Sequence, residues 1–195
     1  MRLNLPNILT LARIAAIPPA VALCFMQSAA ADWILLALFL AAAVTDWLDG
    51  HLARLWREES PFGRFLDPIA DKLLVLALLF MLAATGRLPD YSVIPALVIL
   101  LREILISGLR EFLAGIRVSL PVSRLAKWKT AVQMVAIALL IVGRHGAELL
   151  PVPLDQVPLD QVGALALWLA ALMTAITGVD YMRLGLRHMG SQHGP

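Results

Sequence analysis

Long apolar runs alternate with short polar segments along this 195-residue chain. A helix needs about 20 mostly apolar residues to cross roughly 30 Å of hydrocarbon. Runs of about that length predict six transmembrane helices, at residues 9–30, 33–52, 66–85, 93–113, 126–142 and 162–182. The expected fold class is therefore all-α, in the form of a polytopic membrane bundle.

The first apolar run is expected to remain in the protein as a helix. Asn4 and Pro6 suit a helix start, and no clear small-residue cleavage pattern ends the run. Pro18 and Pro19 lie inside it, and proline cannot donate the backbone hydrogen bond that a continuous helix requires. We therefore expect the first helix to bend near this pair.

Composition supports a membrane protein, and the basic residues give its orientation. The chain is 60% hydrophobic and 15% charged, with a mean hydropathy of +0.80, unlike a soluble domain. With a cytoplasmic amino terminus, only Arg87 and Arg144 of the 16 basic residues fall outside. This asymmetry predicts that both termini are cytoplasmic. The net charge of +2 thus describes a one-sided basic surface, so we expect a lipid bilayer as partner and no nucleic acid.

A single domain is expected over residues 1–187, followed by a flexible tail at residues 188–195. The longest irregular stretch, residues 145–162, contains the local repeat "VPLDQVPLDQV". Its prolines disfavour a continuous helix. We interpret this stretch as an external, solvated connector between the fifth and sixth spans.

Four carboxylates lie where the second and third predicted helices meet the cytoplasmic interface: Asp46, Asp49, Asp67 and Asp71. At about 100° per residue, each helix presents its pair on one face. Carboxylates crowded at membrane depth repel one another unless a cation joins them, and oxygen ligands suit hard ions. The pattern predicts two divalent ions, Mg²⁺ or Mn²⁺. Helix capping or pairing with nearby basic residues is the alternative, but capping needs only one carboxylate per helix end.

Small residues and one arginine extend this face. Gly50, Ala53 and Gly63 leave a bare surface where a flat group can approach the backbone. Arg54 is placed to form paired hydrogen bonds with phosphate. Together with the metals, these residues suggest a bound pyrophosphate that carries a planar base.

Residues 46–71 read D-x2-D-G-x2-A-R-x8-G-x3-D-x3-D, which resembles the signature of the CDP-alcohol phosphotransferase family. The resemblance implies a six-span membrane enzyme, expected to be a homodimer, that joins an alcohol to the phosphoryl group of a CDP-linked substrate and releases CMP. It further implies that Asp46, Asp49, Asp67 and Asp71 bind the metals and that Asp71 is also the base. By the same resemblance, Gly50, Ala53, Arg54 and Gly63 hold the CDP part.

Basic residues in the fourth and fifth spans point to the acceptor alcohol. They are Arg102 and Arg110 in "LLREILISGLREFLAG", and Lys127 and Lys129 in "SRLAKWKTAVQM". This is more positive charge than a neutral or cationic acceptor needs, so we expect an acceptor that bears its own phosphate. The alternative is that these residues only set topology or contact anionic lipids.

Several segments resemble one branch of the family, the CDP-diacylglycerol:glycerol-3-phosphate phosphatidyltransferases: "NLPNILTLARI", "GRFLDPIADKLLV", "REILISGLREFLAG", "KWKTAVQM" and "TGVDY". "KWKT" departs in having Ala126 where glycine is usual. The resemblance implies CDP-diacylglycerol and glycerol 3-phosphate as substrates, at the cytoplasmic face of a bacterial inner membrane. Phosphatidylinositol phosphate, phosphatidylserine and cardiolipin synthases are alternatives within the family. A divalent-cation transporter is a more distant one, disfavoured because the acids lie at one end of the bundle.

Overall fold

The computed structural model describes residues 5–56, 61–116, 118, 124–146 and 158–190. Within these ranges all regular structure is helical. The helices are α1 (Leu5–Ala15), α2 (Ile17–Phe25), α3 (Ala29–Trp56), α4 (Pro61–Ala84), the short 3₁₀ helix η1 (Asp90–Ser92), α5 (Val93–Gly115), α6 (Arg124–Gly146) and α7 (Leu159–Gly190). The predicted all-α fold class is confirmed.

The first predicted span is divided into two helices. α1 ends at Ala15 and α2 begins at Ile17, with Pro18 and Pro19 in its first turn. A proline is tolerated in the first turn because the N–H groups there have no partner within the helix. The bend expected near these prolines is therefore present as a helix boundary.

Within the described part of the chain, five stretches are long and apolar enough to cross a membrane. They are Asn7–Phe25, Ala29–Asp46, Asp90–Gly115, Leu125–Gly143 and Leu159–Leu186. α4 has 24 residues, but its apolar part is the shorter stretch Lys72–Ala84. These helices correspond to the six predicted spans, and α4 differs from the others in the polar character of its first half.

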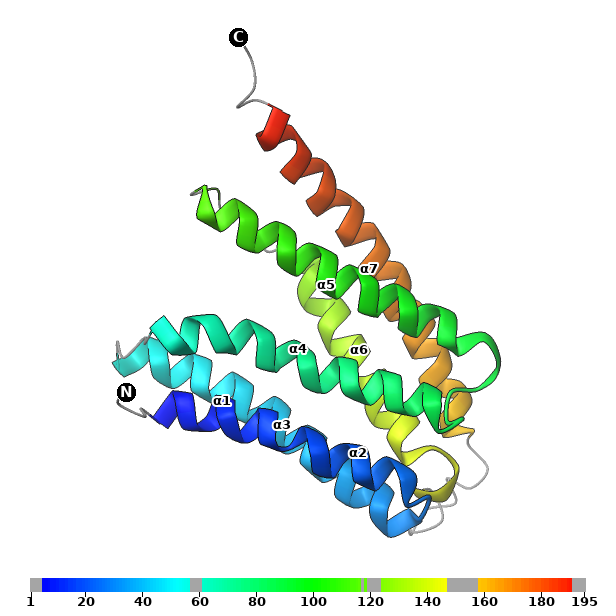
Figure 1. The fold of residues 1–195 in the computed structure, drawn as a ribbon. Helices are drawn as coiled ribbons and strands as arrows, with labels where there is room; N and C mark the ends of the chain where they lie inside the picture. Colours follow the sequence, from blue (N-terminus) through cyan, green and yellow to red (C-terminus); the bar gives the residue numbers. More distant parts are fainter. Residues whose placement is uncertain (1–4, 57–60, 117, 119–123, 147–157, 191–195) are drawn as a thin grey trace.

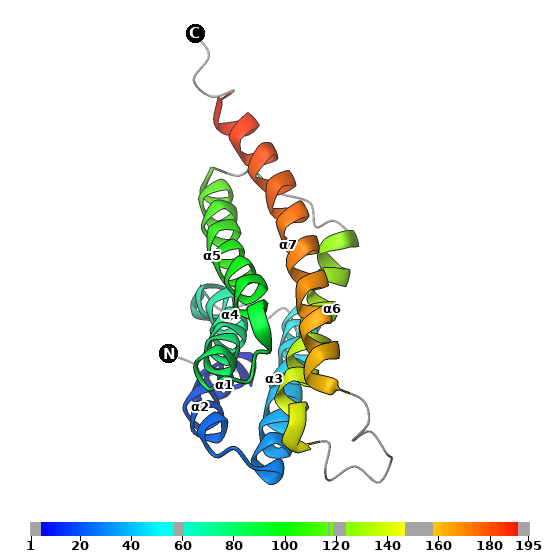
Figure 2. The ribbon, with the colours of Figure 1, turned by 90° about the vertical axis from the view of Figure 1, so that its right-hand side faces the viewer.

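The helices form two groups that meet at one end and diverge at the other (Figure 1). α1 and α2 pack against α3 and α4, while α7 packs against α5 and α6. α6 also contacts α3, so it joins the groups. α1 begins and α7 ends at the diverging end, where α3 also ends and α4 begins (Figures 1 and 2).

The core lies where the two groups meet. Phe39 of α3, Leu78 of α4, Ile137 of α6 and Leu167 of α7 are fully buried within it. Many other large apolar side chains point outward, for example Leu97, Leu101, Ile104, Leu165 and Leu172. Outward apolar side chains around the whole bundle are expected when lipid is the solvent.

A largely buried arginine, Arg87, contacts three helices at the end where the two groups meet. Arg87 follows α4, and its guanidinium pairs with the buried carboxylate of Asp32 at the start of α3. It also donates to the carbonyl oxygens of Cys24 (3.3 Å) and Ile141 (3.5 Å). One side chain therefore links α2, α3 and α6.

Candidate active site

The predicted aspartate site falls at the end of α3 and the start of α4. Both segments are helical, as expected. Of the residues predicted there, the side chain of Asp46 and the buried Gly63 are described. The predictions for Asp49, Gly50, Ala53, Arg54, Asp67 and Asp71 lie outside the side chains that the structure describes, so their roles stay predictions.

Asp46 has a partner that the sequence did not reveal. Its Oδ1 lies 2.6 Å from Nη1 of Arg13, which projects from α1 and is 2% exposed, whereas the Asp46 side chain is 43% exposed. Arg13 is one of the basic residues on which the predicted orientation rests, and its sequence position alone gives it no further role. A basic residue within an apolar helix was the signal that could have identified it, because such residues face a partner or a cavity.

Asp46 and Arg13 line a cavity of about 210 Å³ between α1, α3, α4 and α6, which we call the aspartate cavity. Its described lining is completed by Phe39, Ala42, Ala43, Leu74, Val75, Thr130 and Met134. A carboxylate that faces such a cavity is a suitable donor for a hard divalent ion. Among the described side chains no three possible ligands cluster, but Asp49, Asp67 and Asp71 are not among them. Asp46 is the one predicted ligand whose side chain is described here, and the two metals stay a prediction.

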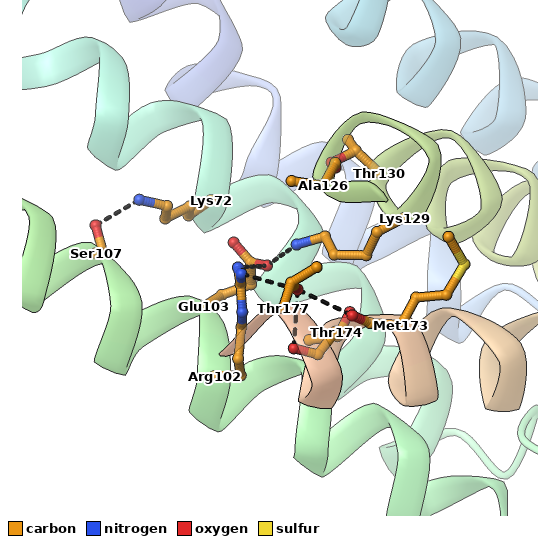
Figure 3. Close-up of polar contacts among 10 residues, drawn as sticks. All are labelled: Lys72, Arg102, Glu103, Ser107, Ala126, Lys129, Thr130, Met173, Thr174 and Thr177. Atoms are coloured by element: carbon orange, nitrogen blue, oxygen red, sulfur yellow. Dashed lines mark hydrogen bonds and ion pairs between the residues drawn. The ribbon is translucent and has the colours of Figure 1, made fainter. Parts of the chain in front are cut away.

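A polar network joins α5, α6 and α7 around Glu103 (Figure 3). Glu103 Oε1 pairs with Lys129 Nζ and accepts a hydrogen bond from Arg102 Nη1 at 3.2 Å. Arg102 Nη2 donates to Thr177 Oγ1 at 3.1 Å, and the guanidinium carbon lies 5.7 Å from the centre of the Tyr181 ring. Two of the four predicted acceptor-binding cations thus meet at one carboxylate.

Glycine in α7 makes room for this network. A Cβ at Gly178 would lie 3.0 Å from Cγ of Arg102, which is tighter than ordinary packing. The arginine stem consequently runs directly across the α7 backbone. The geometry holds Arg102 in place from three sides, through Glu103, Thr177 and Gly178.

A second, smaller cavity of about 70 Å³ lies between α4, α5 and α6, and we call it the lysine cavity. Its described lining consists of Lys72, Val75, Leu76, Glu103, Lys129, Thr130, Gln133 and Met134. Val75, Thr130 and Met134 also line the aspartate cavity. The two cavities are therefore neighbours. The aspartate cavity is lined by one carboxylate and one arginine, and the lysine cavity by one carboxylate and two lysines.

The remaining predicted acceptor-binding residues lie on the surface. Arg110 of α5 and Lys127 of α6 are both exposed, and neither is among the described residues lining the two cavities. Of the four predicted cations, Lys129 is the one that lines a cavity.

Comparison with known proteins identifies the family to which the chain belongs. The family model described as CDP-alcohol phosphatidyltransferase matches residues 3–177. A Rickettsia bellii protein named "CDP-diacylglycerol--glycerol-3-phosphate 3-phosphatidyltransferase" is 47% identical over 180 residues, which cover 92% of this chain and 94% of that protein. A Cereibacter sphaeroides protein of the same name is 39% identical over 217 residues, covering 97% and 98%.

A cardiolipin synthase (CMP-forming) from Oryza sativa is 38% identical over 192 residues, covering 93% of this chain and 57% of that protein. These matches extend over the helices that carry the aspartates and over those that form the lysine cavity. The chain belongs to the CDP-alcohol phosphatidyltransferase family.

Proposed function

We propose that this protein transfers the phosphatidyl group of CDP-diacylglycerol to sn-glycerol 3-phosphate, giving phosphatidylglycerol phosphate and CMP. The observation that carries the proposal is the similarity, over more than nine-tenths of each chain, to bacterial proteins named for this reaction. Two adjoining cavities of different charge character support it, because the reaction brings together two substrates.

The metal site of this proposal consists of Asp46, Asp49, Asp67 and Asp71, with Mg²⁺ or Mn²⁺ as the two ions. When bound, divalent ions supply charge neutralisation and polarisation at the phosphoryl group. Arg13 orients Asp46 through the contact between Nη1 and Oδ1. Gly50, Ala53, Arg54 and Gly63 bind the CDP portion of the donor lipid.

The reaction needs no covalent intermediate on the protein. The acceptor hydroxyl oxygen forms a bond to the phosphorus that carries diacylglycerol, and the bond from that phosphorus to the CMP oxygen breaks. Asp71 takes the hydroxyl proton as general base, and CMP leaves with the bonding electron pair. Positioning the two substrates is then the main task of the remaining residues.

Basic residues of α5 and α6 serve the acceptor phosphate in this scheme: Arg102, Arg110, Lys127 and Lys129. Their environments suggest different tasks. Lys129 lines the lysine cavity, Arg110 and Lys127 lie on the surface, and Arg102 holds Glu103. A phosphate-bearing acceptor would meet the surface cations first and Lys129 last.

The protein is a membrane protein, and we propose that it works in the bacterial inner membrane with its active site facing the cytoplasm. The bacterial relatives and the one-sided basic residues support this placement. We further propose that residues 1–187 act as one catalytic domain and that the protein is a homodimer. The tail at residues 188–195 stays a prediction, and in the structure α7 continues to Gly190.

An acceptor comparison tests the function. Purified protein with CDP-diacylglycerol and Mg²⁺ is offered glycerol 3-phosphate, inositol phosphate, serine or phosphatidylglycerol, and CMP release is measured. We expect release with glycerol 3-phosphate. Preference for phosphatidylglycerol would instead assign cardiolipin synthesis, which the Oryza relative makes the second candidate. Uptake of a labelled divalent ion into vesicles, without acceptor-dependent CMP release, would favour the transporter.

A further inference from the structure

The lysine cavity contains charges that its described residues do not balance. Lys72 and Lys129 contribute two positive charges and Glu103 one negative charge. Glu103 is already shared by Lys129 and Arg102. Among the described lining residues, the positive charges therefore outnumber the negative one.

Lys72 differs from the other interior cations in its partner. Arg13, Arg87, Arg102 and Lys129 each pair with a described carboxylate. The half-buried Lys72 instead donates to the neutral hydroxyl of Ser107 on α5 (Figure 3), and no described carboxylate pairs with it. A charge in the interior without a counter-charge is costly, so a bound anion would relieve that cost.

Gln133 provides a second, independent sign of a ligand. It is 5% exposed, lines the lysine cavity, and its Oε1 has no hydrogen-bond partner within the described structure. It lies four residues after Lys129, so both project from the same face of α6. An unsatisfied amide oxygen in the interior calls for a donor, such as a hydroxyl group.

We propose that the lysine cavity is the acceptor subsite, in which the ammonium groups of Lys72 and Lys129 bind the acceptor phosphate and Gln133 Oε1 accepts a hydrogen bond from its non-reacting hydroxyl. This inference rests on the proposed function, and it adds Lys72 and Gln133 to the acceptor-binding residues. The ligand class is a short polyol monophosphate.

The neighbouring cavities also orient such a ligand. Its phosphate lies between the lysines, and its reacting hydroxyl points past Thr130 toward Asp46, since Thr130 lines both cavities. A volume of about 70 Å³ corresponds to roughly five to seven water positions, at about 10–15 Å³ each. This suits a phosphate group, with the rest of a short polyol reaching into the aspartate cavity, better than a second phospholipid headgroup.

The first test replaces the unbalanced charge. For Lys72→Gln we expect the KM for glycerol 3-phosphate to rise about ten- to a hundredfold, because a charged phosphate contact is lost. The KM for CDP-diacylglycerol and the kcat at saturating acceptor should stay within about twofold of wild type. Arg183→Gln, which removes an exposed cation from α7, is the matched control and should leave both KM values unchanged. An unchanged KM for glycerol 3-phosphate in folded Lys72→Gln would overturn the proposal.

The second test uses a nearly isosteric change, which decides the matter if Lys72→Gln does not fold. Gln133→Glu places a carboxylate beside the proposed phosphate, so we expect the KM for glycerol 3-phosphate to rise at least about tenfold by like-charge repulsion. Gln161→Glu, at an exposed position of α7, is its control. Wild-type kinetics in Gln133→Glu would mean that no phosphate binds in this cavity.

These outcomes separate the subsite from the proposed function. If the wild-type protein releases no CMP in response to glycerol 3-phosphate, the proposed function fails and the subsite fails with it. If wild type is active and both variants retain its KM for glycerol 3-phosphate, only the subsite is wrong.

Discussion

At the scale of single residues, several of the described charged side chains form pairs that join different helices. Arg13 meets Asp46 across α1 and α3, and Lys129 meets Glu103 across α6 and α5. Removing one partner of such a pair leaves the other charge uncompensated, which usually costs more than the pair itself contributes. For a substitution at these positions, ligand binding and turnover should therefore be measured separately, so that a loss of stability is not mistaken for a loss of catalysis.

Asp46 provides the prediction at this scale. Asp46→Asn keeps the size of the side chain and removes its negative charge, so we expect turnover to fall below detection and Mn²⁺ binding to weaken. Electron paramagnetic resonance of added Mn²⁺ measures the binding without reference to activity. Asp160→Asn, at the start of α7, is a suitable control. Near-normal turnover in folded Asp46→Asn would remove this carboxylate from the metal site.

At the scale of helices, apolar runs located the membrane-spanning segments but not the helix ends. The second predicted span covered residues 33–52, whereas α3 runs from Ala29 to Trp56, and α7 likewise extends beyond residues 162–182. An apolar run marks only the part that lies in hydrocarbon, while the backbone can stay helical into the aqueous layer. The aspartates of α3 lie near this transition.

Close helix packing depends on small residues as well as on charge. A Cβ at Gly185 would lie 2.9 Å from Cδ1 of Leu109, so α7 approaches α5 closely at this point. Such approaches are typical of helix pairs in membranes, where van der Waals packing replaces the hydrophobic driving force.

The Arg87 contact gives a prediction at the helix scale. Arg87→Ala should lower the free energy of unfolding by about 3–5 kcal/mol, because the buried Asp32 loses its nearest counter-charge and keeps only His145, 3.7 Å from its Oδ2. Thermal unfolding in detergent measures this, with Arg183→Ala as the exposed control. The double variant Arg87→Ala/Asp32→Ala should recover part of the loss. An unaltered unfolding temperature in Arg87→Ala would show that the contact contributes little.

At the scale of the whole molecule, the end of α3 and the start of α4 share the diverging end with the beginning of α1 and the end of α7 (Figure 1). At the opposite end, Arg87 contacts Asp32 of the first group and also donates to the carbonyl oxygen of Ile141 in α6 of the second group. The aspartate cavity is lined by α1, α3 and α4 together with α6, so the proposed site includes residues of both groups.

Surface charge gives the prediction at this largest scale. Arg110→Ala and Lys127→Ala should each raise the KM for glycerol 3-phosphate about three- to tenfold at low ionic strength, because exposed cations attract an anion over a distance. The effect should fade as salt is added, since screening shortens that distance to about 10 Å at 0.1 M. Steady-state kinetics across a salt series provides the measurement. If the KM for glycerol 3-phosphate is unchanged at every salt concentration, these residues only set the topology.

The sequence alone determined the helical class, the positions of the spans, the break at Pro18 and Pro19, and the family signature. These features follow from local causes: the thickness of hydrocarbon sets the length of an apolar run, proline lacks a backbone donor, and helical periodicity fixes which residues share a face. The shared face of each aspartate pair is a prediction on the same ground, because each pair lies within one helix.

Only the tertiary structure decided which side chains meet across helices. Lys129 pairs with Glu103 over 26 residues of sequence, Lys72 contacts Ser107 over 35, and Arg87 reaches Asp32 over 55. Periodicity gives the face on which each residue lies but not the helix that covers that face. The neighbours of Lys72 and Gln133, and with them the proposed acceptor subsite, therefore depend on how α4, α5 and α6 pack together.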